Sequence, residues 1–192
     1  MRTTYLCVAA ALALAACVEV DMTLEVLGED EARVTGFLQM ERQMYDMSGG
    51  DDSFCPADDG GTLTLTDTHA RCDFDKTGTF DEIMSADAEA GSPADVQGEI
   101  TYLGDNRVRV MLPLGTMQDG MEDMGDDPQM LAMMRQMFAG MSITFSVQGR
   151  EIESSTAMIS DDGTRASYTL GVDDLITSTP TAMPDFETIV RY

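Results

Sequence analysis

Alternating apolar and polar positions dominate the chain and predict a fold made mainly of β-strands. The clearest alternation runs from Val18 to Val26, where every even position is apolar, as in a strand that buries one face. A hairpin is predicted around the turn Gly104–Asn106, because apolar side chains after this turn share one face while Arg107 and Arg109 share the other. Strands are further predicted at residues 32–40, 62–66, 99–103, 107–114, 142–148, 151–159, 164–170 and 186–192, the last of them as an edge strand.

Helical spacing is confined to a few stretches. Met40, Met44 and Met47 fall at i, i+4 and i+7 and predict a short helical extension, and another short helix is predicted at residues 81–90. A longer helix is predicted from residue 126 to residue 140, because two aspartates and a proline occupy its first turn. Together these elements predict one α+β domain, with a mainly antiparallel β-sheet and about two helices packed on it.

The N-terminus has the pattern of a secretory signal peptide. Arg2 precedes an apolar run of 12 residues from Tyr5 to Ala16, which is too short for a permanent membrane-spanning helix. The run ends in Leu14-Ala15-Ala16-Cys17, which resembles the lipobox of bacterial lipoproteins, in which the cysteine receives a diacylglyceryl group and becomes the new N-terminus. We therefore predict a signal peptide at residues 1–16 and a single domain at residues 17–192, anchored in the membrane through a lipid on Cys17. An ordinary signal peptide cleaved nearby is the alternative.

The chain carries a large negative charge, which limits its partners. Its 192 residues include 35 acidic and 11 basic ones, for a net charge of −24, and loss of the signal peptide removes one further positive charge. Such a surface repels phosphate backbones and excludes a nucleic-acid partner, while 43% hydrophobic residues are too many for a disordered acidic chain. With the lipid anchor, this predicts a domain in the bacterial cell envelope that faces the periplasm, at either the inner or the outer membrane. Because the first strand follows Cys17 without a tether, the domain should lie close to the bilayer.

Two cysteines remain for a disulfide once Cys17 carries lipid. Cys55 and Cys72 form an even pair in an oxidising compartment, which favours a bridge over two buried free thiols. The bridge would close a loop of about 17 residues and stabilise the fold by about 3 kcal/mol in the chain-entropy model.

Methionine is the strongest oddity of the composition, with 17 residues. Five of them follow helical spacing, which is typical of a helix facing a core, and their flexible side chains also suit a pocket that adapts to an acyl chain or a partner helix. These ligand-binding candidates are Met130, Met133, Met134, Met137 and Met141. Met117, Met121 and Met124 have the spacing of methionine-rich copper sites, but the only histidine, His69, is far away in the sequence.

Two stretches resemble chemical motifs without the context that those motifs need. Asp75–Thr79 is identical to the phosphorylation motif of P-type ATPases, but the chain is far too short for such a pump. Residues 73–84 begin like an EF-hand loop and end in Met84, where calcium requires a bidentate glutamate.

Hydrolase chemistry is poorly supported, because a Gly-x-Ser-x-Gly elbow is absent and a serine mechanism would depend on His69. We therefore predict that the protein is not an enzyme and holds no cofactor or metal. Loose calcium binding by the acidic loops is the alternative, at Asp51-Asp52, Asp58-Asp59 or Asp161-Asp162.

Two short motifs, Gly149–Ser155 and Ser160–Thr164, lie in the late strand pair. With the lipobox, the strand directly after it and a central helix, they make the chain similar to the LppM family of envelope lipoproteins. This resemblance implies an α+β domain implicated in binding membrane lipids or glycolipids, without established catalysis.

Three functions are compatible with these observations. The first is a lipid- or glycolipid-binding module, which predicts an apolar cavity beneath the helix of residues 130–141. The second is a structural or assembly lipoprotein whose acidic face engages a basic protein partner, which predicts a filled core and salt-sensitive association. The third is a periplasmic protein that binds copper at Met117–Met124 or calcium on the loops. We favour the first function.

Overall fold

Strands make up most of the residues that the computed structural model describes, which are residues 18–50, 54–57, 60–83, 98–114, 128–137, 139–171, 174 and 184–192. The strands are β1 (Glu19–Val26), β2 (Ala32–Glu41), β3 (Gly61–Leu65), β4 (His69–Gly78), β5 (Glu99–Gly104), β6 (Arg107–Leu112), β7 (Ser142–Gln148), β8 (Glu151–Ser155), β9 (Met158–Ile159), β10 (Arg165–Gly171) and β11 (Phe186–Arg191). The helices are α1 (Arg42–Met47) and α4 (Pro128–Met137). Cys17 and residues 1–16, the predicted signal peptide, lie outside the described residues.

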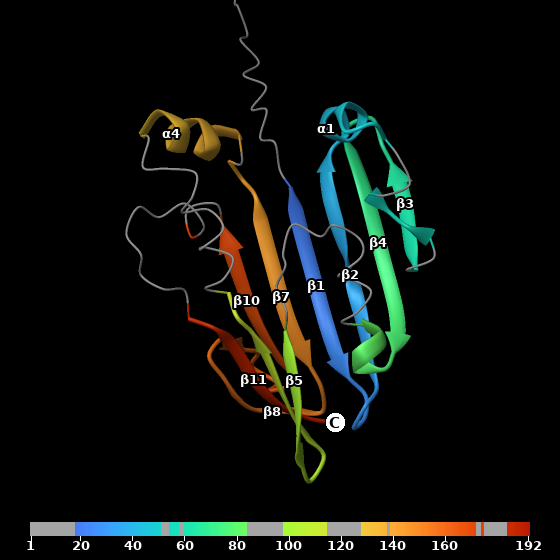
Figure 1. Ribbon diagram of the computed structural model, residues 1–192, viewed down its shortest axis with the longest axis vertical. Coiled ribbons are helices and arrows are strands. Elements are labelled where there is room, and N and C mark those ends of the chain that lie inside the picture. Colours follow the sequence, from blue (N-terminus) through green and yellow to red (C-terminus); the bar gives the residue numbers. More distant parts are fainter. Residues whose placement is uncertain are drawn as a thin grey trace, which may run out of the picture.

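The strands divide between two sheets (Figure 1). The larger sheet has seven strands in the order β3-β4-β2-β1-β7-β10-β9, and the smaller sheet has four in the order β5-β6-β11-β8. Neighbouring strands are antiparallel except for β1 and β7, which run parallel. The predicted class, an α+β domain with mainly antiparallel strands, is confirmed, and the structure adds the division into two sheets.

The two clearest sequence patterns form the predicted elements. The alternation after Cys17 becomes β1, in which Val26 is buried and Leu24 packs against the core. The predicted hairpin is formed by β5 and β6. Its turn residues Asp105 and Asn106 have φ angles of 55° and 59°, the left-handed conformation that a two-residue hairpin turn requires.

Four strands differ from the prediction. The sequence does not predict β4, which pairs with both β2 and β3, because its apolar alternation stops after Phe74. The single strand predicted at residues 151–159 is divided, and β8 joins the smaller sheet while β9 joins the larger one. The prediction of β11 as an edge strand is wrong, since it lies between β6 and β8. A strand with one buried face has the same alternation at the edge and inside a sheet, so the pattern does not distinguish the two.

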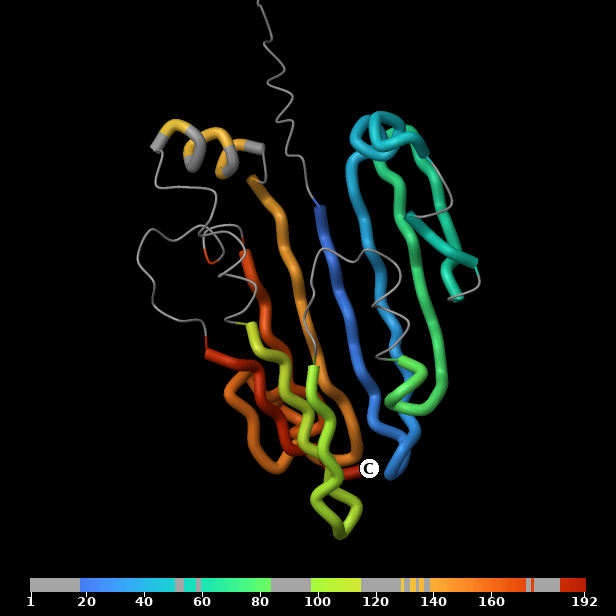
Figure 2. Tube along the Cα trace, viewed as in Figure 1, coloured from blue at the N-terminus to red at the C-terminus, as the bar shows by residue number. Residues whose placement is uncertain are grey.

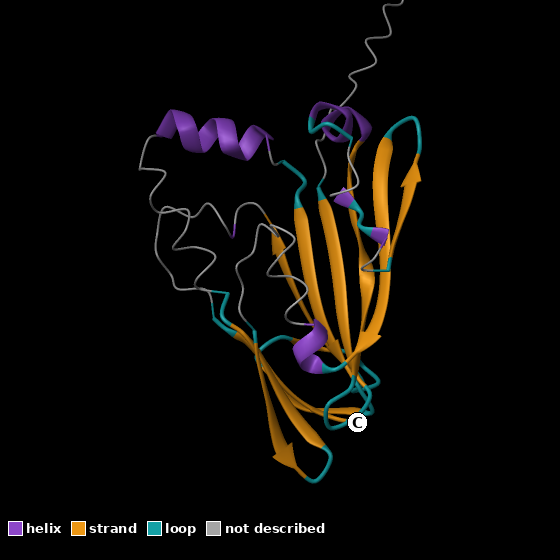
Figure 3. Ribbon diagram, turned by 45° about the vertical axis from the view of Figure 1, so that its right-hand side comes forward, coloured by secondary structure: helices purple, strands orange, loops and turns teal. Residues whose placement is uncertain are grey.

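The hydrophobic core lies between the two sheets. Both sheets contribute fully buried side chains, and a single helical turn at residues 80–83 adds Phe80 and Ile83. The core consists of Val26, Ala32, Phe80, Ile83, Val108, Val110, Leu114, Val147, Ile152, Ala166, Leu170, Phe186 and Val190. The smaller sheet therefore covers the larger one only at the end remote from α1 and α4 (Figures 1 and 3).

Both helices lie at the opposite end of the larger sheet, where the chain enters β1 (Figure 2). Helix α1 confirms the short helical extension after β2, and α4 lies within the predicted range of residues 126–140. Residues 84–90 of the other predicted helix lie outside the described part of the chain. No helix among the described residues is long and apolar enough to cross a membrane.

Candidate functional site

The larger sheet presents an apolar face that the smaller sheet covers only in part. On β1 and β2 the even-numbered side chains share this face, as strand alternation and register require. Those nearest the smaller sheet belong to the core, whereas those nearest the start of β1 are half-buried and are not members of the core cluster. We call the second group, with its neighbours on β3 and β4, the open apolar region: Val20, Met22, Leu38, Met40, Leu63, Leu65 and Phe74.

Strand register brings these side chains into rows. Val20 on β1 is the register partner of Leu38 on β2, and Leu38 is the partner of Cys72 on β4. Cys72 in turn pairs with Leu63 on the edge strand β3, so one apolar row crosses four strands. Leu63 and Leu65 are 38% and 44% exposed, so the apolar surface extends to the edge of the sheet.

Gly36 brings the next row close to the backbone of β2. Its register partners are Met22 on β1 and Phe74 on β4. A Cβ atom at Gly36 would lie 2.9 Å from Cζ of Phe74 and would clash with the backbone oxygen of Asp21. The Phe74 ring therefore lies against the backbone of β2 at a position that has no side chain.

One cation borders this surface. Lys76, the only lysine of the chain, is the register partner of Val34 on β2 and lies on the apolar side of β4 by alternation from Phe74. Its charge helps to lower the pKa of Glu82, after the hydrogen bonds that Glu82 accepts from the Thr79 backbone and side chain. An apolar surface next to a charged group matches an amphipathic ligand better than a purely apolar one.

The opposite face of the same sheet is polar. The guanidinium of Arg165 donates hydrogen bonds to the hydroxyl groups of Thr23 and Ser146, at 2.7 and 2.9 Å. Ser146 also bonds to Ser167 at 3.0 Å, across the pairing of β7 with β10. This face therefore carries hydrogen-bonded polar side chains, whereas the other face carries the open apolar region.

The predicted disulfide joins Cys55 to Cys72, with Cα atoms 5.4 Å apart. Cys72 lies in the middle of β4, so the bridge ties the segment before β3 to the apolar face. Gly61 at the start of β3 donates its N–H to the Pro56 carbonyl at 3.1 Å, and a Cβ there would lie 3.0 Å from Sγ of Cys55. The disulfide therefore holds β3 at the edge of the sheet.

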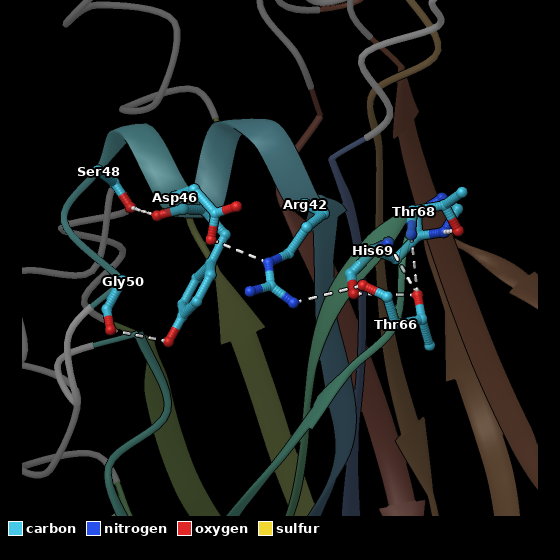
Figure 4. Close-up of polar contacts among 8 residues, drawn as sticks. Arg42, Asp46, Ser48, Gly50, Thr66, Thr68 and His69 are labelled. Carbon is cyan, nitrogen blue, oxygen red and sulfur yellow. Dashed lines mark hydrogen bonds and ion pairs between the residues drawn. The ribbon is translucent and has the colours of Figure 1, made fainter.

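Helix α1 is fixed to the β3–β4 turn at the end where the chain enters the sheet (Figure 4). Arg42 pairs with Asp46 at 2.9 Å, and its backbone N–H bonds to the Thr68 carbonyl at 2.9 Å. Tyr45 is buried and donates its hydroxyl to the Gly50 carbonyl at 3.0 Å. These contacts fix the position of α1 at this end of the larger sheet.

The methionine candidates are only partly described. Met133 on α4 is 64% exposed, so its side chain does not face a filled core. Met141 packs against the core just before β7. The side chains of Met130, Met134 and Met137 lie outside the described residues, as do Met117, Met121 and Met124, so the predicted ligand-binding role of the cluster stays a prediction.

The acidic motifs have local structural partners. Asp75 forms a two-pronged ion pair with Arg33 at 2.7 and 2.5 Å, and these hydrogen bonds lower the pKa of the Asp75 carboxyl. The carboxylate of Asp162 accepts hydrogen bonds from Ser160 and Thr164, which likewise lower its pKa. Within the described part of the chain, no group of three or more His, Cys, Asp or Glu side chains is arranged to hold a metal ion. Asp51-Asp52 and Asp58-Asp59 lie outside that part.

The far end of the molecule carries a small polar hollow, lined by Asn106, Arg150, Glu151, Arg191 and Tyr192. Arg191 in this lining pairs with Glu153 and lies near Glu151. Burial, followed by a hydrogen bond with Tyr102, raises the pKa of the Tyr192 hydroxyl. This surface is chemically distinct from the open apolar region.

Sequence reasoning finds only part of the open apolar region. It places Val20, Met22 and their neighbours on one face of β1, but it does not place Phe74 or Leu63 beside them. The signal that would have found β4 is the short alternation of Ala70, Cys72 and Phe74. The pairing of β4 with β2 and β3 has no local signature.

Comparison with known proteins identifies the fold. The chain is similar to the solved structure of the folded domain of Mycobacterium tuberculosis LppM, with a TM-score of 0.50 and 14% sequence identity, over 91% of this chain and 90% of that one. No protein-family model and no curated protein sequence matches the chain. At this identity the likeness shows a shared fold, and it confirms the structural resemblance to LppM that the sequence layout implied.

Proposed function

We propose that this chain is a membrane-anchored lipoprotein of the bacterial cell envelope, and that it is a non-catalytic binding module for a lipid or glycolipid. The observation that carries the proposal is the position of the open apolar region. It begins with Val20, three residues after Cys17, on a face that the smaller sheet leaves uncovered. A ligand leaving the membrane beside a lipidated Cys17 would therefore meet an apolar surface first.

The chemistry of the region supports an acyl chain as the ligand. Its side chains are aliphatic, thioether and aromatic, and burying such groups contributes about 25 cal/mol per Å² of apolar area. Contiguous apolar surface on a protein of this charge indicates a binding surface. The fold shared with the LppM folded domain agrees with the proposal.

Native mass spectrometry tests both parts of the proposal. The chain expressed in a bacterial envelope should begin at Cys17 and carry the mass of a diacylglyceryl group there. A second form with Cys17→Ser, exported behind a conventional signal peptide so that the disulfide forms, should co-purify with a lipid mass. Lipid bound to this form cannot be the anchor, so the anchor and the ligand are measured separately.

A matched pair of variants tests where the ligand lies. Leu38→Glu puts a charge into the open apolar region, whereas Gln39→Glu puts the same charge on the polar face of the same strand. We expect the first variant to reduce bound lipid at least tenfold and the second to leave it unchanged, provided that both retain the disulfide and unfold cooperatively. Equal lipid occupancy in the two variants would refute this site, and a bare mass in the Cys17→Ser form would favour a protein partner.

A further inference from the structure

The chain joins the larger sheet immediately after the predicted anchor. The carbonyl of Val18 accepts a hydrogen bond from the backbone N–H of Ser142, at 3.0 Å, before β1 begins at Glu19. One residue spans at most about 3.6 Å, so a lipid on Cys17 would have no flexible tether. This step rests on the lipid anchor of the proposed function, and it brings this end of the sheet to the membrane surface.

Both helices lie at that end. Helix α1 follows β2 directly, and Gln39 near the end of β2 pairs with Glu19 at the start of β1. Helix α4 precedes β7, whose first residue, Ser142, also pairs with Glu19. Figures 1 and 3 show α1 and α4 at the same end of the larger sheet, the end at which β1 begins.

Each helix exposes a methionine there. Met47 at the end of α1 is 73% exposed, and Met133 in the middle of α4 is 64% exposed. The helix backbone around Met47 is held by the Arg42 and Tyr45 contacts, so its exposure follows from a fixed position of α1. Moving a large, solvent-exposed thioether side chain from water into an apolar medium is favourable, because its apolar surface leaves the water.

We propose that Met47 and Met133 enter the boundary between headgroups and acyl chains of the bilayer when the chain is anchored at Cys17. Three contacts, the anchor and the two helices, would then hold the larger sheet upright on the membrane. In this orientation the open apolar region opens at the bilayer surface. The net charge of −24 disfavours anionic lipid, so the partner surface is zwitterionic.

A tryptophan measurement tests this contact, because the chain contains no tryptophan of its own. In a protein of residues 17–192 with Cys55 and Cys72 oxidised, Cys17 is the one free thiol and couples to a maleimide phospholipid in phosphatidylcholine vesicles. Single variants Met47→Trp and Met133→Trp report depth through quenching by brominated acyl chains. The control is Met158→Trp on the edge strand β9, which is 80% exposed and pairs with Ser167, in a row that crosses β1 at Thr23 and not at its first residue.

We expect anchored Met47→Trp and Met133→Trp to shift their emission to the blue and to be quenched at least twofold more than Met158→Trp. Emission of all three at the wavelength of water-exposed tryptophan would overturn the proposal, as would insertion of only one helix. The chemical anchor replaces the natural lipid, so this result does not depend on lipidation in the cell. Failure of lipidation, seen as a missing diacylglyceryl mass, would instead count against the proposed function.

Discussion

Phe74 lies against the backbone of β2 because residue 36 has no side chain. A Cβ at Gly36 would meet the Asp21 carbonyl oxygen and the Phe74 ring, and the first of these is backbone that cannot move without shifting β1. We expect Gly36→Ala to destabilise the fold by about 1–3 kcal/mol, as overpacking does in other cores. The measurement is the free energy of unfolding in urea.

Gly28 provides the matched control for this substitution. The nearest atom to a Cβ at Gly28 is Cβ of Glu31 at 3.6 Å, an ordinary van der Waals distance. Gly28→Ala should therefore change stability by less than about 0.5 kcal/mol, as surface substitutions usually do. Equal effects of the two alanine variants would show that chain entropy, and not crowding at Gly36, dominates.

Single residues also show where sequence motifs mislead. Asp75 stands in a five-residue match to a phosphorylation motif, yet it lies on β4 with its carboxylate bound by Arg33 from β2. The partner is 42 positions away, so no local pattern reveals it.

Among the elements, β3 depends most on the disulfide. It is a short edge strand whose residues after Gly61 are exposed, and the segment before it is held by Cys55 through the bridge to β4. Replacing both cysteines by alanine should lower the free energy of unfolding by about 3 kcal/mol, the value expected for a loop of this length. Urea unfolding of the variant against the oxidised protein measures it.

Hydrogen exchange separates the local effect of this disulfide from the global one. Amides of β3 should lose protection in the cysteine-free variant while those of β7, inside the sheet between β1 and β10, should follow only the global change. Cys17→Ser is the control for loss of a thiol. Uniform loss of protection in β3 and β7 would contradict a specific role of the bridge at the sheet edge.

How far elements can be predicted depends on whether their signal is local. Alternation of apolar and polar side chains over a few residues predicts β1, β6 and β7, and Asp105 and Asn106 predict the turn between β5 and β6. The division of residues 151–159 into β8 and β9 depends on which sheet each half meets. β11 pairs with both β6 and β8, and its own residues do not specify that it has two neighbouring strands.

At the scale of the molecule, the larger sheet is longer than the sheet that covers it. The core fills one end between the sheets, and the larger sheet keeps an apolar face toward its other end. The two helices lie at that other end (Figure 3). The sequence predicts a membrane-proximal domain with an apolar face on β1. It does not predict how much of the larger sheet the smaller sheet covers, because that depends on packing between strands that are remote in the chain.

Acid should weaken the whole molecule despite its excess negative charge. The carboxyls of Asp75, Glu82 and Asp162 have pKa values lowered by the hydrogen bonds that they accept in the fold. A group with a lowered folded pKa stabilises the protein above its unfolded pKa, and this stabilisation is lost as the pH falls through the folded value. We therefore expect the free energy of unfolding to fall below about pH 4, the ordinary range of carboxyl pKa values.

Asp75 allows this linkage to be tested with one pair of substitutions. Asp75→Asn removes the charge that Arg33 binds, so the variant should be less stable than the parent protein at pH 7. The difference should shrink as the pH falls through the lowered folded pKa of Asp75, because the carboxyl of the parent protein is then protonated as well. Arg33→Gln removes the partner and should show the same convergence. A stability difference that stays constant from pH 7 to pH 2 in both variants would mean that these residues act through packing rather than through the charge of the carboxylate.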